Sequence, residues 1–358
     1  MNALGRRIAA LIGAQGPISI AQFMTIALHD PLDGYYATRD PLGVAGDFTT
    51  APEISQMFGE FLGLWCVQLW HDQGRCGAKR LVELGPGRGT LMADALRAMA
   101  VAPDFLEDLE IVLVEASPAL RSVQRERLKD WADRIRWVTR FDAAAGDRPL
   151  FLIANEFFDA LPIRQYVRTA RGWCERMVSA DGDGALAFVL APVPVPESMI
   201  PADRGDAPDG AVYETCPSAL SLGEEIARVV ANQGGGALIV DYGYDRPDFG
   251  ETLQAVADHS FAAILDEPGE SDLSAHVDFR GLAASAEGSA TAYGPIPQGE
   301  FLEDLGIAER VARLAQSNPA SGDMLGAALH RLVDPGQMGT LFKALAIVRR
   351  DAPAPPGF

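Results

Sequence analysis

The pattern of apolar and polar residues predicts a helical opening, an alternating strand–helix part and a mixed closing part. Apolar residues recur at helical spacing over residues 2–14, and Ser19 and Gln22 fit a capping box that starts a second helix. A long apolar helix is predicted over residues 53–70. Because its hydrophobic residues run nearly all round, we expect it to pack on more than one face.

Short apolar runs that end at polar or glycine turns predict four strands, at 80–84, 110–114, 135–139 and 150–154. Helical patterns lie between the first three, at 90–100 and 117–132. Strands that alternate with helices are joined by right-handed crossovers and form a parallel sheet. The sequence therefore predicts an α/β fold.

The rest of the chain adds an insertion and a second, mixed lobe to this core. A β-meander is predicted at 164–168, 173–178 and 185–190, followed by a helix at 218–232, a strand at 237–240, helices at 298–305 and 322–333, and a last strand at 341–349. The expected division is an N-terminal helical segment and lid (1–52), a core (53–162 and 211–250), an inserted meander and loop (163–210), a helical and mixed lobe (251–337), a final core strand (338–350) and a disordered Pro-rich tail (351–358).

Charge and composition narrow the class of partner. The formal charge of −19 repels polyanions, so we expect no nucleic-acid partner. No run of about 18 apolar residues occurs, so we expect no membrane insertion. The four cysteines form no CxxC pair and no metal-ligand spacing with histidine, which predicts a reduced protein without a metal. No pattern in the sequence indicates an oligomeric state.

The N-terminus carries a weak targeting signal. Arg6 and Arg7 precede any acidic residue, but Gly13 and Pro17 interrupt the apolar stretch and no small-residue cleavage site follows. An ordinary amphipathic helix explains the segment better. We therefore expect a cytoplasmic protein.

The strongest chemical signal is the glycine loop at residues 85–89. An apolar strand leads into Gly85, Gly87 and Gly89 and then into a helix that begins at Thr90. Glycines tolerate positive φ and close approach of a ligand, and the helix N-terminus attracts an anionic group. A dinucleotide site requires a third glycine at the position of Thr90. The loop thus favours S-adenosylmethionine, with Glu83 on its ammonium, over a dinucleotide or a ligand-free turn.

Two further acids occupy nucleoside-binding positions. Glu115 ends the second strand, 115 − 87 = 28 residues after Gly87, where an acid accepts hydrogen bonds from ribose hydroxyls. The usual spacing is about 20 residues, so the loop at 101–108 must absorb the difference. Asp142 follows the third strand, where an acid would meet the adenine amino group. The alternatives are a helix N-terminal acid and a turn cap, respectively.

The fourth strand opens into a polar segment, residues 155–162. Ligands of open α/β sheets bind beyond the carboxyl ends of the strands, so Asn155 and Glu156 would face the sulfonium and the methyl acceptor. Glu156 and Asp159 share a face if a helical turn follows. Two carboxylates suit a planar cation such as a guanidinium. We predict that Glu156, Asn155 and Asp159 are the catalytic residues; the alternative is that the acids cap a short helix.

The motifs together resemble the MidA-like methyltransferases, a family that includes a mitochondrial arginine methyltransferase of complex I assembly. The resembling segments lie at residues 46–55, 83–90, 155–162, 241–243, 272–279 and 338–343. The resemblance implies a class I, Rossmann-like methyltransferase fold: a seven-stranded sheet with its last strand antiparallel. It also implies a lid in which Asp47, Thr49 and Thr50 contact the cofactor, and an acceptor site bordered by His276, Asp278 and Tyr242.

The function implied by this resemblance is S-adenosylmethionine-dependent methylation of a protein substrate. The acceptor would be an arginine of a respiratory complex I subunit, methylated to support assembly of the complex. Three alternatives remain open: an assembly chaperone that uses the cofactor as a structural ligand, a small-molecule methyltransferase, and an NAD-dependent oxidoreductase.

Overall fold

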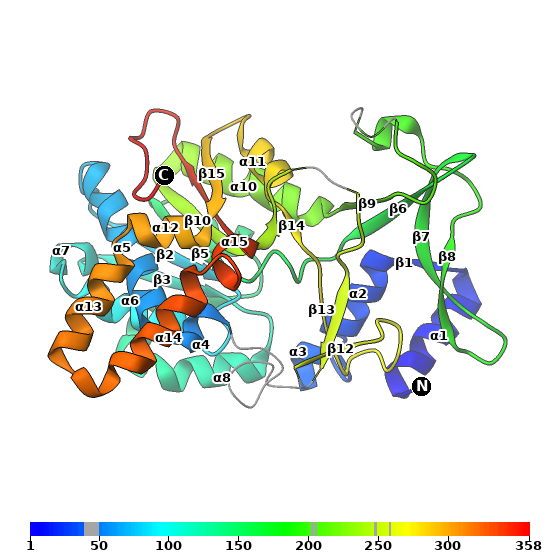
Figure 1. The fold of residues 1–358 in the computed structure, drawn as a ribbon, viewed down its shortest axis with the longest axis horizontal. Coiled ribbons are helices and arrows are strands. Elements are labelled where there is room, and N and C mark those ends of the chain that lie inside the picture. Colours follow the sequence, from blue (N-terminus) through cyan, green and yellow to red (C-terminus); the bar gives the residue numbers. More distant parts are fainter. Residues whose placement is uncertain (39–49, 202–203, 205, 247–248, 258) are drawn as a thin grey trace.

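The protein consists of an α/β core and a smaller lobe beside it (Figure 1). The computed structural model describes residues 1–358 except 39–49, 202–203, 205, 247–248 and 258. Among the described residues no helix is long and apolar enough to cross a membrane.

The core is a mixed sheet with the strand order β4-β3-β2-β5-β10-β16-β15. The strands, in that order, are Ile135–Val138, Leu109–Val114, Lys79–Leu84, Leu150–Asn155, Gly235–Tyr244, Phe342–Val348 and Thr291–Pro297. The first five are parallel, whereas β16 is antiparallel to both of its neighbours. β14 (Val277–Asp278) adds a short parallel pairing to β10. The predicted α/β fold with an antiparallel last strand is confirmed.

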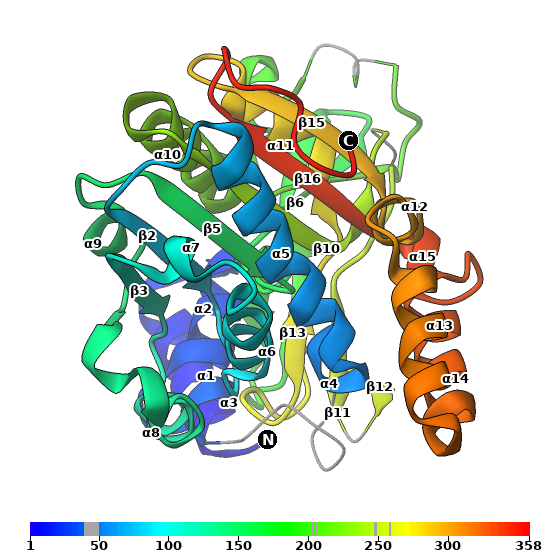
Figure 2. The same ribbon diagram turned by 90° about the vertical axis from the view of Figure 1, so that its left-hand side faces the viewer.

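Helices cover both faces of this sheet. Alternate strand residues point to opposite sides, and because both sides carry apolar residues, both must be covered. Leu81 and Ile153 belong to the cluster that contains α5, whereas Val82 and Leu152 belong to the cluster on the other face. Figure 2 shows α5 lying across the sheet. The helices of the core are α4 (Ala51–Ile54), α5 (Gln56–Asp72), α6 (Thr90–Met99), α7 (Pro103–Leu106), α8 (Pro118–Arg127), α9 (Asp142–Ala145), α10 (Pro217–Gln233), α11 (Phe279–Ala286) and α15 (Met338–Leu341).

A helical extension leaves the core after β15. It consists of α12 (Gln298–Asp304), α13 (Ile307–Ser317) and α14 (Gly322–Val333), and α13 packs beside α14 (Figure 2). The sequence pattern predicts α12 and α14 but not α13. Its buried residues Ile307 and Val311 do recur at helical spacing, so the prediction omits a helix that the apolar pattern allows.

The smaller lobe joins the N-terminal helices to the inserted strands. α1 (Ala3–Gln15) and α2 (Ile20–His29) pack on the sheet β1-β7-β6-β9, with β8 on its edge, and a second sheet has the order β12-β11-β13. In the order β1, β7, β6, β9, β8, β12, β11 and β13, the strands are Ile18–Ser19, Gly172–Ala180, Arg164–Thr169, Val212–Thr215, Leu186–Leu190, Ser260–Ala262, Gln254–Ala257 and Asp272–Ser274. A short helix, α3, spans Tyr35–Thr38. The capping box of Ser19 and Gln22 is present as predicted.

Two of the predicted helices differ from those in the structure. The helix predicted over 53–70 is broken at Ser55, whose extended backbone ends α4 and whose hydroxyl accepts a hydrogen bond from the N–H of Met57 to start α5. The helix predicted over 117–132 ends at Arg127 and continues as a 3-10 turn, Lys129–Arg134.

The tail predicted to be disordered instead packs on the core. Trp65 Nε1 donates a hydrogen bond to the carbonyl of Pro356 at 3.1 Å, and the rings of Phe301 and Phe358 lie 5.3 Å apart. These contacts join the last residues to α5 and α12.

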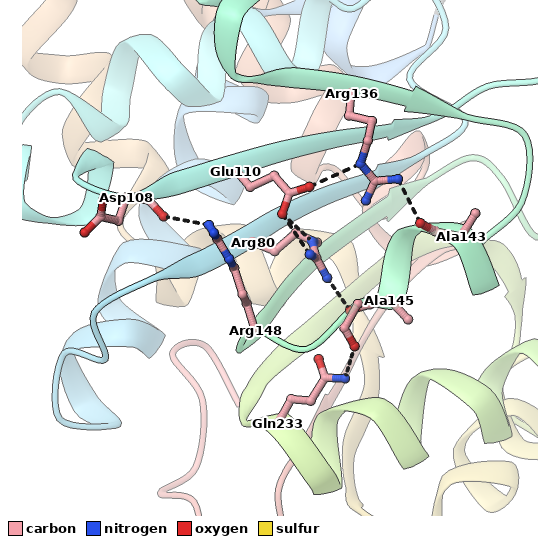
Figure 3. Close-up of polar contacts among 9 residues, drawn as sticks. Arg80, Asp108, Glu110, Arg136, Ala143, Ala145, Arg148 and Gln233 are labelled. Atoms are coloured by element: carbon pink, nitrogen blue, oxygen red, sulfur yellow. Dashed lines mark hydrogen bonds and ion pairs between the residues drawn. The ribbon is translucent and has the colours of Figure 1, made fainter.

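At the start of β2, the buried Arg80 forms an ion pair with the half-buried Glu110 (Figure 3). Arg80 donates two hydrogen bonds to Glu110 Oε2, at 3.0 and 2.7 Å, and Arg136 donates one to Glu110 Oε1 at 3.2 Å. Arg80 also donates to the carbonyl of Ala145. This network lies at the opposite end of β2 from the glycine loop.

Candidate functional site

The glycine loop has the backbone conformation that its composition predicts. Gly85, Gly87 and Gly89 have φ values of 62°, 52° and 77°, in the left-handed region that L-residues rarely adopt. Gly89 is the N-cap residue of α6. At Gly85 a Cβ atom would come within 2.9 Å of Phe157, so a side chain would also be excluded by contact.

A small pocket of about 60 Å³ lies at the carboxyl ends of β2 and β5. Its described lining residues are Thr50, Pro52, Glu53, Glu83, Gly85, Pro86, Gly87, Arg88, Thr90, Leu91, Asn155 and Glu156. Seven residues predicted from the sequence therefore meet here, whereas Gly89 does not line it among the described residues. Glu53, from the predicted lid, and Arg88, from the glycine loop, also line the pocket.

Two buried acceptor atoms in this pocket lack a hydrogen-bond partner among the described residues: Glu83 Oε2 and Asn155 Oδ1. Glu83 is only 2% exposed. Burial, and next the charge of Glu115, raises the pKa of Glu83 to about 8. Leaving such atoms unpaired is costly. A positively charged donor such as the α-ammonium of S-adenosylmethionine fits both of them.

Glu115 is linked to the glycine loop through the side chain of Gln124. Its Oε1 accepts the N–H of Ser117 at 2.7 Å, and its Oε2 accepts Gln124 Nε2 at 3.2 Å. The same Gln124 nitrogen donates to the carbonyl of Gly87 at 2.7 Å. Burial raises the pKa of Glu115. Glu115 does not line the pocket among the described residues, so its predicted ribose contact stays a prediction.

Four other predicted cofactor residues have different outcomes. Asp142 is exposed: its carboxylate lies 3.3 Å from Arg140 Nε and accepts the N–H of Ala143, which is the turn-capping role weighed as the alternative. Asp47 and Thr49 lie outside the described residues. Thr50 lines the pocket, and its side chain makes no helix-capping hydrogen bond.

Glu156 has a strained backbone at the end of β5. Its φ of 49° is in the left-handed region, which is rare for a residue with a Cβ atom and is typical of functional sites. Its Oε1 accepts the N–H of Ala51 and Asn155 Nδ2, both at 3.2 Å. Burial, and next the charge of Asp159, raises the pKa of Glu156 to about 7.

Asp159 lies deeper, close to two of the residues predicted to border the acceptor. Asp159 and Tyr242 are each 9% exposed, and Asp159 Oδ1 and Tyr242 Oη lack a partner of good geometry among the described residues. Burial raises the pKa of Asp159 to about 6, and the Tyr242 hydroxyl nearby offsets part of this shift. The ring of His276 meets that of Tyr242 edge-on at 5.5 Å, and burial lowers the pKa of His276.

Asp278, the third residue predicted to border the acceptor, has a structural role. It is the N-cap residue of α11, and its carboxylate accepts the N–H of Gly281 at 2.9 Å. This contact accounts for an acid at that position without a ligand.

Asp241 is a buried acid that was not predicted as a site residue. It lies on β10 next to the end of β5 and its side chain is fully buried. Burial and the charges of Asp159 and Glu156 raise its pKa. The signals in the sequence are its place near the end of an apolar strand and its position in the resembling segment 241–243.

Comparisons with known proteins agree with this geometry. A family described as "Putative S-adenosyl-L-methionine-dependent methyltransferase" matches residues 61–296. The mitochondrial protein arginine methyltransferase NDUFAF7 of Danio rerio is 37% identical over 96% of this chain and 86% of its own length, and that of Homo sapiens is 37% identical over 96% and 82%. A crystal structure from Burkholderia thailandensis, bound to S-adenosyl-homocysteine, superposes with a TM-score of 0.88 at 30% identity and covers 99% of this chain and 94% of that one.

These comparisons correct one expectation and settle the class of enzyme. The prediction of a cytoplasmic protein is wrong, because the relatives are named as mitochondrial proteins. The predicted resemblance, the cofactor S-adenosylmethionine and the methyltransferase activity are confirmed. The chain belongs to this family of S-adenosyl-L-methionine-dependent methyltransferases.

Proposed function

We propose that the enzyme methylates an arginine side chain of a protein, specifically of a respiratory complex I subunit, and thereby supports assembly of that complex. The observation that carries the proposal is the group of carboxylates at the ends of β5 and β10, where Asp159 Oδ1 has no partner of good geometry among the described residues. The names of the relatives, which are protein arginine methyltransferases, support the same acceptor.

The cofactor would be held by the pocket at the glycine loop. Glu83 and Asn155 offer acceptors for its ammonium group, and the left-handed loop lets the backbone approach it closely. When bound, S-adenosylmethionine supplies the methyl group as a sulfonium. The residues of this chain need only hold the donor and the acceptor in line and exclude water.

The acceptor guanidinium would be held by Glu156 and Asp159. A planar cation with several N–H donors matches two carboxylates better than a lysine ammonium does. Tyr242 and His276 would flank it, since the Tyr242 ring is an aromatic surface for a cation and its hydroxyl lies near Asp159. Both acids favour positive charge at the acceptor while the methyl group arrives, and the proton leaves the guanidinium afterwards.

The test is a search for the methyl mark in cells. Deletion of the gene should remove an arginine methyl group from a complex I subunit in a mass spectrometric comparison, and wild-type enzyme should restore it. Glu156→Gln should fail to restore the mark. Glu126→Gln, a matched change at an exposed salt bridge with Lys129, should restore it fully.

Two outcomes would count against parts of the proposal. If no arginine mark disappears on deletion, the acceptor is wrong. If Glu156→Gln restores complex I assembly without the mark, then binding rather than methyl transfer supports assembly, as expected for a chaperone.

A further inference from the structure

Asp241 makes an unusual set of hydrogen bonds with the turn that follows β5. Its Oδ2 accepts three successive backbone N–H groups: those of Phe157 at 3.1 Å, Phe158 at 2.9 Å and Asp159 at 3.3 Å. Its Oδ1 accepts the N–H of Tyr242 at 2.9 Å. Successive N–H groups that converge after a left-handed residue form a nest that binds anions. Here the acceptor is a side chain of the protein itself.

The nest explains the strained conformation of Glu156. A backbone φ of 49° is energetically unfavourable for a residue with a Cβ atom, so the surrounding structure must compensate for this cost. With Glu156 left-handed, the next three N–H groups converge on one carboxylate oxygen. The N–H of Glu156 itself pairs with the carbonyl of Val240, one residue before Asp241. The ends of β5 and β10, which are neighbours in the sheet (Figure 1), are thereby joined by four hydrogen bonds.

The two acids proposed to hold the acceptor stand at the two ends of this nest. Glu156 precedes the three N–H groups and Asp159 supplies the last of them. Any loosening of the turn changes the distance and direction between these carboxylates. Asp241 cannot contact an acceptor itself, because it is fully buried and both of its oxygens are occupied.

We propose that Asp241 is a positioning residue: it holds the turn after β5 in the conformation that aims the carboxylates of Glu156 and Asp159 at the acceptor. This inference rests on the proposed function for the identity of the acceptor. The effect of Asp241 on the turn does not depend on that function and can be measured without any acceptor.

The experiment compares Asp241→Asn and Asp241→Ala with wild type and with Glu110→Gln. The amide of Asn keeps one oxygen for the three N–H groups but turns a donor toward the N–H of Tyr242, whereas Ala leaves all four N–H groups unpaired. Glu110→Gln is the matched control, since it also changes a carboxylate that accepts several hydrogen bonds into an amide, but at the opposite edge of the sheet.

Three quantities are measured for each protein: hydrogen exchange of the peptide that spans residues 156–162, the affinity for S-adenosylhomocysteine, and the kcat of methyl transfer to an arginine-containing protein. We expect faster exchange in this peptide, with kcat lowered about tenfold in Asp241→Asn and about 100-fold in Asp241→Ala. The affinity for S-adenosylhomocysteine should change by no more than about twofold, because Glu83 and the glycine loop are untouched.

A merely structural role would give a different result. It would lower cofactor affinity and kcat together, in proportion to the loss of stability, and Glu110→Gln would show the same losses at equal stability. Unchanged exchange in the 156–162 peptide, or wild-type kcat with a loosened turn, would overturn the inference. If Asp241→Ala does not fold, Asp241→Asn keeps the test. If wild-type enzyme transfers no methyl group to arginine, the proposed function fails, and the exchange data still decide whether Asp241 holds the turn.

Discussion

Thr90 Oγ1 donates a hydrogen bond to Glu53 Oε1 at 2.5 Å. Thr90 is the first residue of α6, directly after the glycine loop, and Glu53 belongs to α4 and lines the same pocket. Arg127 of α8 donates to the same hydroxyl. The contact connects the segment that carries α4 to the cofactor loop. Thr90 thus does more than occupy the position at which a dinucleotide site requires glycine.

Thr90→Val should therefore weaken cofactor binding. Valine has the shape of threonine without the hydroxyl, so α4 loses its hydrogen bond to the loop while the fold is kept. We expect the Kd for S-adenosylhomocysteine to rise about fivefold, which corresponds to about 1 kcal/mol for one hydrogen bond. Isothermal titration calorimetry measures it. Thr25→Val, which removes an exposed hydroxyl bonded to the carbonyl of Ala21, is the control and should leave the Kd unchanged. Equal Kd values for all three proteins would show that the contact does not support binding.

Glu83→Gln should separate stability from cofactor binding. The pKa of Glu83 is raised from 4.5 to about 8, mainly by burial, so the folded protein holds this proton more tightly than the unfolded chain does. The resulting stabilisation is fully present below about pH 4.5 and is lost as the pH rises toward about 8. Glutamine stays neutral and avoids this loss. Between about pH 6 and about pH 8, the Tm of the cofactor-free variant should fall less than that of wild type.

The same variant should bind the cofactor poorly, because the ammonium loses its charged acceptor. We expect the Kd for S-adenosylmethionine to rise at least about tenfold. Parallel Tm curves for the two proteins across this pH range would refute the buried carboxyl as the source of the pH dependence. An unchanged Kd would refute the contact with the ammonium.

The activity should rise with pH through the titration of the two acceptor carboxylates. Burial is the main cause of the raised pKa values of Glu156, about 7, and Asp159, about 6. Because only the ionised carboxylates hold a guanidinium, kcat/KM should increase between about pH 6 and about pH 7 and then level off. Glu156→Gln should lower kcat/KM and remove the upper part of this rise. Initial rates at saturating cofactor measure it, and a flat wild-type profile over this range would contradict the assignment.

The parts of the fold that the sequence pattern predicts depend on contacts close in the chain. The short apolar strands of the core and the glycine loop follow from the residues within each element. The break at Ser55 does not, because no glycine or proline between Glu53 and Gln56 marks the end of α4. The tail shows the same limit: its Pro-rich composition predicts disorder, but Trp65 and Phe301 supply partners that composition does not contain.

The residues of the site also divide into those that a short segment predicts and those whose role depends on contacts distant in the sequence. Glu83 and the glycines lie in one short segment, so the cofactor-binding site that they form can be predicted from that segment alone. Asp241 is 82–84 residues away from the three N–H groups that it accepts, so its role appears only when β5 and β10 lie side by side. Asp142 makes a turn-capping contact, which is the second role that an acid after a strand can have, and its contact with adenine stays a prediction.

The ion pair at the opposite edge of the sheet should be a main contributor to stability. Arg80 is 5% exposed and Glu110 is its acidic partner at 2.7 Å (Figure 3). Glu110→Gln would leave the guanidinium buried without a full counter-charge. Because Arg80 is buried but the Glu110 side chain is 24% exposed, we expect a loss of about 2 kcal/mol of unfolding free energy. Urea denaturation at neutral pH measures the loss, and Glu126→Gln at the exposed pair with Lys129 should show no measurable change.

The pH dependence of this loss checks its cause. Burial raises the pKa of Glu110, but the hydrogen bonds and charges of Arg80 and Arg136 outweigh it and hold the pKa below 4.5. A carboxyl whose pKa is depressed by folding stabilises the protein above its unfolded value, and this stabilisation is lost as the pH falls through the folded value. The difference in unfolding free energy between wild type and Glu110→Gln should therefore be constant from about pH 5 upward and shrink below about pH 4. A difference that stays constant into acid would mean that packing, rather than charge, is what the variant removes.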